Sequence, residues 1–249
     1  MSSSSSSTPL NALVTGASRG IGEVISLQLA NEGYNVTLAA RSLDDLNAVK
    51  AKLPIVRDAQ KHSVWPLDIS DIDAVTNFKG SPLPAEKYDL FVSNAGVVDF
   101  APLVHQSPES ISSLFNVNLI APVALTKALL KAFGDSPRKT TTHFIYVSSV
   151  VALRGFPNVA VYSSSKSGLD GFVRSLAAEV APLNIRVNSI NPGPTKTEMT
   201  ASLDVEAFTA GNPIKGWIYP DAIADGVVYL AKSKNITGIT LQVDNGAGI

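Results

Sequence analysis

Short apolar segments alternate along the chain with longer segments in which apolar residues recur at helical spacing. Each short segment is rich in β-branched or aromatic residues, which predicts a β-strand. The predicted strands cover residues 12–15, 36–40, 63–67, 90–93, 144–148, 185–190 and 239–243. Strands that alternate with helices form βαβ units, because each parallel crossover passes over one face of the sheet. The pattern therefore predicts an α/β, doubly wound Rossmann-type fold with a seven-stranded parallel sheet flanked by helices.

Two long helical segments are predicted in the middle of the chain, over residues 108–133 and 161–181. Gly168, Gly171, Phe172 and Ala178 give the second segment more small and apolar positions than one sheet face requires. Two interpretations remain open. The helices pack on the sheet alone, or they also pack against another subunit.

The composition favours one compact domain. The 249 residues are 45% hydrophobic and 16% charged, enough apolar surface for a large core. We expect a single dinucleotide-binding catalytic domain over residues 10–249, preceded by a disordered tail over residues 1–9 that contains a run of six serines. This tail lacks the arginines of a transit peptide and the apolar stretch of a secretion signal, so we expect a cytoplasmic protein.

Charge and residue usage argue against several classes of function. The net charge is -1 and no Lys/Arg block occurs, so neither nucleic acid nor a membrane is an expected partner. There is no cysteine, which excludes disulfides and thiolate chemistry. The three histidines, His62, His105 and His143, lack ligand spacing, so no metal site is expected.

A glycine-rich turn follows the first predicted strand and opens the first helix, with the sequence Thr-Gly-Ala-Ser-Arg-Gly-Ile-Gly over residues 15–22. Glycines there allow a phosphate to approach the helix N-terminus, where amide groups and the helix dipole favour negative charge. Taken alone, the turn could simply require positive φ angles. Three residues separate the first two glycines and one separates the next two, unlike the common dinucleotide fingerprint.

This spacing resembles that of the short-chain dehydrogenase/reductase family, in particular its single-domain carbonyl and 3-oxoacyl reductases. From Leu10 to about Gly246 the family's motifs follow in the same order: Asp68 after the third strand, Asn94-Ala95-Gly96, Asn118, Ser149, Tyr162, Lys166 and Asn191-Pro192-Gly193. Two departures are Ser93, where Asn is more frequent, and Asp244-Asn245-Gly246 in place of Asp-Gly-Gly. The resemblance implies a nicotinamide-dependent oxidoreductase that moves hydride between the cofactor and a small carbonyl or alcohol substrate. It also implies a homo-oligomer, either a tetramer or a dimer.

Tyr162 and Lys166 are four residues apart on a predicted helix and therefore share one face. A free tyrosine has a pKa of about 10, which a neighbouring ammonium group lowers. We expect Tyr162 to be the acid/base, tuned by Lys166, and Ser149 to hydrogen-bond the same substrate oxygen. The resemblance further implies that Lys166 holds the nicotinamide ribose and that Asn118 anchors a water in a proton path. Asn118 could instead serve structure alone.

The expected cofactor is NADP(H) rather than NAD(H). No acidic residue ends the second strand, where Arg41 and Ser42 stand, and Arg19 lies in the glycine turn, so a 2′-phosphate would be attracted. Asp44 and Asp45 follow and could contact the ribose instead. The expected cofactor-binding residues are Gly16, Ser18, Arg19, Gly20, Ile21, Gly22, Arg41, Ser42, Asp68, Ile69, Asn94, Ala95, Gly96, Tyr162, Lys166, Pro192, Gly193, Thr195 and Thr197.

Residues 198–219 are expected to form a lid over the substrate. The lid contains Met199, Leu203, Phe208, Ile214 and Trp217, which either contact an apolar substrate or pack the lid onto the domain. Three functions compete for this site: turnover as a reductase, nucleotide binding as a catalytically silent sensor, and isomerisation or epimerisation. The intact Ser149, Tyr162 and Lys166 favour turnover, and the short lid argues against an isomerase or epimerase.

Overall fold

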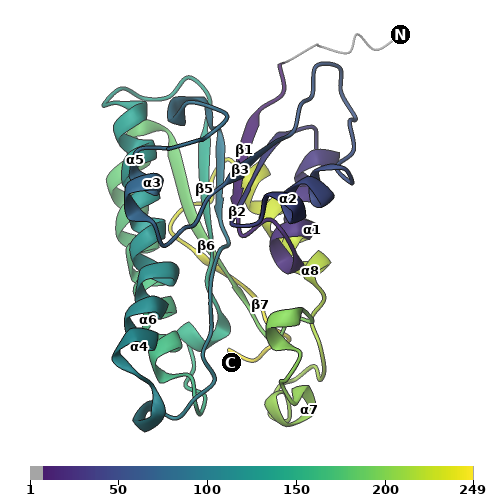
Figure 1. Ribbon diagram of the computed structural model, residues 1–249, viewed down its shortest axis with the longest axis vertical. Helices are drawn as coiled ribbons and strands as arrows, with labels where there is room; N and C mark the ends of the chain where they lie inside the picture. Colours follow the sequence, from purple (N-terminus) through teal and green to yellow (C-terminus); the bar gives the residue numbers. More distant parts are fainter. Residues whose placement is uncertain (1–7, 249) are drawn as a thin grey trace.

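The computed structural model describes residues 8–248, and its centre is a parallel sheet of seven strands (Figure 1). The strands are β1 (Asn11–Thr15), β2 (Asn35–Ala40), β3 (Ser63–Pro66), β4 (Leu90–Ser93), β5 (Thr142–Val147), β6 (Ile185–Pro192) and β7 (Thr240–Val243). Their order across the sheet is β3-β2-β1-β4-β5-β6-β7. The predicted fold class is confirmed. Of the predicted tail only Thr8 and Pro9 are described, and Pro9 is buried; residues 1–7 lie outside the described residues.

Helices cover both faces of the sheet (Figure 1). They are α1 (Gly20–Asn31), α2 (Leu43–Lys50), α3 (Ile72–Thr76), α4 (Pro108–Phe115), α5 (Ala121–Phe133), α6 (Ala160–Val180), α7 (Val205–Phe208) and α8 (Pro220–Lys232). Helices α1, α2 and α8 pack on one face in a cluster that includes Ile25, Leu46 and Val227. Helices α3, α5 and α6 pack on the other, around Val75, Leu125 and Val173. Coverage of both faces explains why every residue of β4 and β5 is buried.

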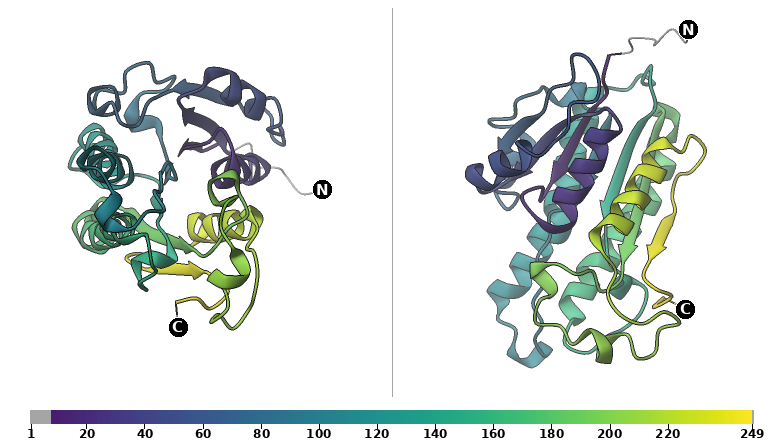
Figure 2. Two further views of the ribbon diagram at one scale, coloured as in Figure 1. Left: turned by 60° about the horizontal axis from the view of Figure 1, so that its bottom comes forward. Right: turned by 90° about the vertical axis from the view of Figure 1, so that its right-hand side faces the viewer.

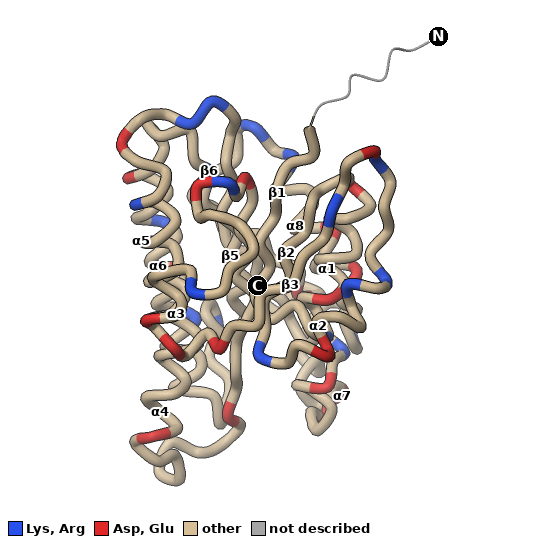
Figure 3. Tube along the Cα trace, turned by 45° about the horizontal axis from the view of Figure 1, so that its top comes forward, with Lys and Arg blue, Asp and Glu red and all other residues tan. Residues whose placement is uncertain are grey.

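Short single-turn helices connect these elements. They are η1 (Ala85–Lys87), η2 (Leu103–His105), η4 (Val150–Ala152), η5 (Ala181–Leu183) and η6 (Glu198–Thr200). Basic and acidic residues are interspersed along the chain trace (Figure 3). The fold thus leaves no extended block of one charge on the described part of the chain.

The predicted helix over residues 108–133 is interrupted in the structure. Between α4 and α5 lies one π-helical turn, η3 (Asn116–Ile120), in which Asn118 is fully buried. By length and composition this helical stretch is apolar enough to span a membrane. Leu125 and Leu129, however, are completely buried in the core cluster with the sheet and α6. We therefore interpret it as a core helix.

The strand order reverses between β1 and β4, which are neighbours in the sheet although β2 and β3 come between them in sequence. In open α/β sheets, ligands bind at such a switch point, beyond the carboxyl ends of the strands. The segment with η6 and α7 lies near this end of the sheet in both views of Figure 2. The topology therefore places a ligand crevice between the sheet end and this segment.

Candidate active site

A cleft of about 490 Å³ opens at the carboxyl ends of the strands. Ser149, Tyr162 and Lys166 line it. So do all of the expected cofactor-binding residues except Gly22. The fourth expected catalytic residue, Asn118, does not line the cleft. The fold thus brings nearly all of the sequence-predicted residues together in one place.

The glycine turn is built by close backbone approach. Gly16 and Gly20 have positive φ angles of 65° and 59°. At Gly22 a Cβ atom would lie 2.2 Å from the Gly16 carbonyl oxygen, so only glycine fits. The N-cap residue of α1, Arg19, makes no side-chain capping bond. The first amides of α1 therefore remain available to a phosphate, and the turn fits the pyrophosphate of a dinucleotide.

Asn94 ties the end of β4 to this turn. Its Nδ2 donates to the carbonyl oxygens of Thr15 (3.0 Å) and Gly16 (3.1 Å), and its backbone N–H donates to Thr15 Oγ1 (3.1 Å). The side chain of Asn94 thus shapes the floor of the cleft from within the protein. Thr15 contributes equally to this connection between β4 and the turn. It was not among the predicted site residues, although its position at the end of β1, directly before the glycines, could have indicated it.

Ser149 follows β5, and Tyr162 and Lys166 lie one turn apart near the start of α6. Lys166 is only 4% exposed; its Nζ donates to the Val147 carbonyl oxygen (2.8 Å) and lies 5.9 Å from the centre of the Tyr162 ring. The Ser149 hydroxyl accepts from Val151 N–H (3.3 Å) and lies close enough to the Tyr162 phenol to lower its pKa. The three side chains thus meet at the inner end of the cleft.

The expected lowering of the Tyr162 pKa is wrong for the unliganded chain. Burial raises the pKa of Tyr162 to about 12, and only the hydrogen bond with Ser149 opposes it. Burial also lowers the pKa of Lys166 to about 8, against the charge of Asp170. Removal from water therefore outweighs the neighbouring ammonium group. A phenol that keeps its proton at neutral pH is suited to donate it to a carbonyl oxygen.

Both the oxygen and the nitrogen of the Asn118 side-chain amide are hydrogen-bonded to neighbouring residues. Its Oδ1 accepts from Val97 N–H (2.9 Å), and its Nδ2 donates to the Val97 carbonyl oxygen (2.9 Å) and to Ser165 Oγ (3.2 Å). A Cβ atom on Gly96 would lie 3.2 Å from Asn118 Oδ1 and 3.5 Å from Lys166 Nζ, so Gly96 separates the two side chains. Asn118 therefore fixes the loop after β4 to α6. Its role in a proton path stays a prediction.

The other end of the cleft carries charge. Arg41 is exposed at the end of β2, and Ser42 caps α2 by accepting from Asp45 N–H (3.2 Å). Hydrogen bonds from Ser70 lower the pKa of Asp68, with a smaller contribution from Arg41. These residues surround the region where an adenosine ribose would lie if the pyrophosphate occupies the glycine turn.

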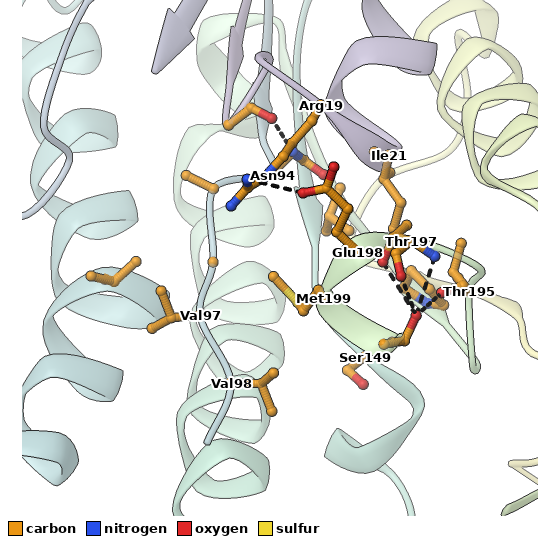
Figure 4. A pocket seen from close by; sticks show the side chains of 18 of the residues that line it. Arg19, Ile21, Asn94, Val97, Val98, Ser149, Thr195, Thr197, Glu198 and Met199 are labelled. Atoms are coloured by element: carbon orange, nitrogen blue, oxygen red, sulfur yellow. Dashed lines mark hydrogen bonds and ion pairs between the residues drawn. The ribbon is translucent and has the colours of Figure 1, made fainter. Parts of the chain in front are cut away.

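Arg19 forms an ion pair with an acidic residue. Its Nη1 lies 3.0 Å from Glu198 Oε2 across the cleft (Figure 4). The pair joins the glycine turn to the start of the expected lid. This ion pair could not be predicted from the sequence, because the partners are far apart along the chain and each is exposed.

The segment after β6 begins with a hydroxyl network. Thr200 Oγ1 donates to the Thr195 carbonyl oxygen (2.6 Å), and Thr197 caps η6 (Figure 4). Beyond it, Met199, Leu203 and Phe208 line the cleft, whereas Ile214 and Trp217 do not. Phe208 stacks on Phe156, with ring centroids 4.5 Å apart. Part of the segment thus lines the cleft and part packs onto the domain, and contact with an apolar substrate stays a prediction.

The sequence reading missed part of the apolar wall. Val97, Val98 and Phe100, directly after Asn94-Ala95-Gly96, line the cleft together with Val151. The apolar residues directly after Asn94-Ala95-Gly96 were the available signal. Over residues 8–248 no group of three His, Asp or Glu side chains is placed to hold a metal ion.

The family model for short chain dehydrogenase matches residues 10–207. Carbonyl reductase family member 4 of Xenopus tropicalis is 33% identical over 94% of this chain and 95% of its own length, and human 3-oxoacyl-[acyl-carrier-protein] reductase is 32% identical over the same shares. The crystal structure of a short chain dehydrogenase from Burkholderia cenocepacia, in complex with NADP, superposes with a TM-score of 0.86 at 25% identity, over 97% of this chain and 99% of that one. The chain belongs to the short-chain dehydrogenase/reductase family and is an oxidoreductase of that family.

Proposed function

We propose that this protein is an NADP(H)-dependent reductase of carbonyl compounds, with Tyr162 as the proton donor. The observation that carries the proposal is that Ser149, Tyr162 and Lys166 line the same cleft as the glycine turn. When bound, the reduced nicotinamide supplies the hydride. Ser149 and Tyr162 hold the carbonyl oxygen by hydrogen bonds, and Tyr162 gives it a proton as negative charge develops there.

The preference for NADP(H) is supported by the charges at the ribose end. Arg41 lines the cleft where β2 ends, and β2 has no acidic residue at that end that would repel a 2′-phosphate. Arg19 lines the same end and can add a second positive charge if it leaves Glu198. Asp45 also lines the cleft and acts in the opposite direction.

The substrate that fits is uncharged and has an apolar body. The wall outside the cofactor region is mostly apolar, and Ser113 and Thr200 are its uncharged polar residues; its apolar side chains are Val97, Val98, Phe100, Val150, Val151, Val159, Met199, Leu203 and Phe208. The charged residues lining the cleft are Lys166, beside Tyr162, and Arg19, Arg41, Asp45, Asp68 and Glu198, which come from the glycine turn, the ends of β2 and β3, the first turn of α2 and the start of η6. A carboxylate in the apolar part would lose its hydration without gaining a partner.

The test is NADPH oxidation, followed by absorbance, against pairs of ketones that differ only in a carboxylate. We expect turnover of the neutral member of each pair. Tyr162→Phe should lose most turnover and keep NADPH binding, because it removes one hydroxyl and little volume. Tyr229→Phe, at an exposed tyrosine of α8, is the matched control. A wild-type protein that binds NADPH and turns over no carbonyl compound would support the silent nucleotide-binding alternative, and near-normal rates in Tyr162→Phe would remove the tyrosine from this role.

A further inference from the structure

A buried carboxylate lies next to the catalytic pair on the same helix. Asp170 is 2% exposed and follows Lys166 by four residues and Tyr162 by eight, so the three side chains lie along one side of α6. This side faces the sheet, since Lys166 bonds the end of β5 and Asp170 bonds Asn191 of β6. The carboxylate is thus behind the catalytic pair and does not line the cleft.

One hydrogen bond holds Asp170 in place. Its Oδ2 accepts from Asn191 Nδ2 at 2.9 Å, and Asn191 is completely buried directly before Pro192 and Gly193 of the cleft wall. The other oxygens of the pair, Asp170 Oδ1 and Asn191 Oδ1, are buried without a hydrogen-bond partner. A single neutral donor compensates poorly for the burial of a carboxylate, so a cation is needed nearby.

Lys166 is the cation one helical turn before Asp170 on the same side of α6, although the two side chains do not form an ion pair within 4.0 Å. Its Nζ has one protein acceptor, the Val147 carbonyl oxygen, although an ammonium group has three protons to donate. Burial favours the neutral amine, and the negative charge of Asp170 is what opposes it by raising the pKa of Lys166. The negative charge of Asp170 therefore stabilises the buried ammonium group of Lys166, and the positive charge of Lys166 stabilises the buried carboxylate of Asp170.

The other groups around Lys166 do not provide the negative charge that stabilises its ammonium form. Tyr162 on the same helix keeps its proton near neutral pH, and Ser149 after β5 is uncharged. Asn118 of η3 faces Lys166 across Gly96 and is uncharged as well. The remaining charged residues of the cleft, Arg19, Arg41, Asp45, Asp68 and Glu198, come from the glycine turn, the ends of β2 and β3, the first turn of α2 and the start of η6.

We propose that Asp170 is a positioning residue that holds Lys166 in its ammonium form beside Tyr162. The inference rests on the proposed function for its catalytic consequence. It explains why a carboxylate is buried at this point of the helix, held only by the amide of Asn191. The ammonium form gives Lys166 three protons to donate, enough for Val147 and ribose hydroxyls, and the positive charge that stabilises negative charge at Tyr162.

The experiment compares wild type with Asp170→Asn, which keeps the shape of the side chain and removes its charge. We expect kcat/KM for NADPH-dependent reduction to fall off at a lower pH in the variant, by about one pH unit, because Lys166 loses its proton sooner. The pH dependence of NADPH binding, followed by fluorescence, should move in the same direction. Asp225→Asn, at an exposed helical aspartate that bonds Gln28, is the control and should leave both profiles unchanged.

A merely structural role would lower the rate by the same factor at every pH, and that result would overturn the proposal. The binding profile separates this failure from failure of the proposed function, because it needs no turnover. Should Asp170→Asn fail to fold, NMR of the lysine side chains in the wild-type protein decides the matter, with Lys166→Arg to assign the signal. A Lys166 amine that is already neutral below pH 7 in wild type would contradict the proposal, and one that is charged there would support it.

Discussion

Arg41 and Arg19 illustrate how differently two arginines in one cleft can be placed. Arg41 is exposed and lines the cleft at the end of β2, where it also helps to lower the pKa of Asp68. We predict that Arg41→Ala reduces kcat/KM with NADPH by about tenfold or more and leaves the value with NADH almost unchanged, since one charge-assisted contact to the 2′-phosphate is lost. Steady-state rates with both cofactors measure this. Arg57→Ala, at an arginine that bonds the Glu32 carbonyl oxygen away from the cleft, is the control. An Arg41→Ala variant that loses nothing with NADPH would contradict the cofactor assignment.

Arg19 has to leave Glu198 before it can serve a phosphate. Most of both side chains is exposed to water, so the ion pair is worth at most about 1 kcal/mol. We predict that Glu198→Gln tightens NADPH binding by up to about fivefold and changes NADH binding less, because it frees Arg19 and removes a negative charge from the cleft. Fluorescence titration with both cofactors measures the two affinities. Glu206→Gln, at an exposed position of α7, serves as the control. Weaker NADPH binding in Glu198→Gln would show that the pair closes over the cofactor instead of competing with it.

At the same scale, the identity of the candidate site residues could be predicted from their spacing, and their protonation could not. The intervals between Ser149, Tyr162 and Lys166 are visible in the sequence. The pKa of Tyr162 depends on how far the surrounding chain removes the phenol from water, and this is a property of the folded protein. Asp170 could not be predicted as a site residue either, because its hydrogen-bond partner Asn191 lies on a different element, β6.

Among the elements, the strands could be predicted because short β-branched segments between turn signals allow no helix of useful length. The π-helical turn η3 could not be predicted from the sequence. Helical periodicity continues through residues 108–133, and the wider turn depends on the bonds of Asn118 to Val97, 21 residues earlier, and to Ser165. Such contacts between distant segments leave no trace in the local pattern.

Helix α5 is joined to β5 by a buried pair of hydroxyls. Thr126 Oγ1 donates to the Pro122 carbonyl oxygen (2.7 Å), so the Tyr146 hydroxyl, 2.6 Å away, must donate to Thr126. We predict that Thr126→Val lowers the free energy of unfolding by about 1–3 kcal/mol, because it leaves the buried Tyr146 hydroxyl without an acceptor. Tyr146→Phe should cost less, since Thr126 keeps its bond to Pro122. Denaturant unfolding of both variants and of the double variant tests this. Equal losses in the two single variants would contradict the order of donors.

At the scale of the whole molecule, we propose that the chain forms a homo-oligomer, a tetramer or a dimer, through the faces of α5 and α6 that the sheet does not cover. Both helices cover the same face of the sheet (Figure 1). Ile120 at the start of α5 is 45% exposed, and Gly168 and Ala178 of α6 are also exposed. We predict that light scattering gives a multiple of 26.1 kDa and that Ile120→Asp shifts the protein toward the monomer. Ile55→Asp, at another exposed isoleucine, is the control. A wild-type protein that is only monomeric at micromolar concentration would exclude the oligomer.

The stability of the whole molecule should depend on pH through His143, which lies in β5 beside β4 and β6. Burial lowers the pKa of His143 from 6.5 to about 4, and the charge of Arg186 adds to the effect. The unfolded chain therefore binds a proton at this histidine before the folded chain does, and stability falls as the pH drops from 6.5 toward 4. At pH about 5 the loss attributable to His143 is about 2 kcal/mol. The lowered pKa of Lys166, at about 8, acts only at higher pH and does not overlap with this range.

Urea unfolding of wild type and His143→Gln at several pH values measures this contribution. We expect the free energy of unfolding of His143→Gln to fall less steeply with decreasing pH over this range, whatever the variant costs at neutral pH, because glutamine does not titrate. His105→Gln, at an exposed histidine, should keep the wild-type slope. Parallel slopes for His143→Gln and wild type would show that the folded protein accommodates a charged histidine at this point of the sheet, and that the acid sensitivity of the fold has another source.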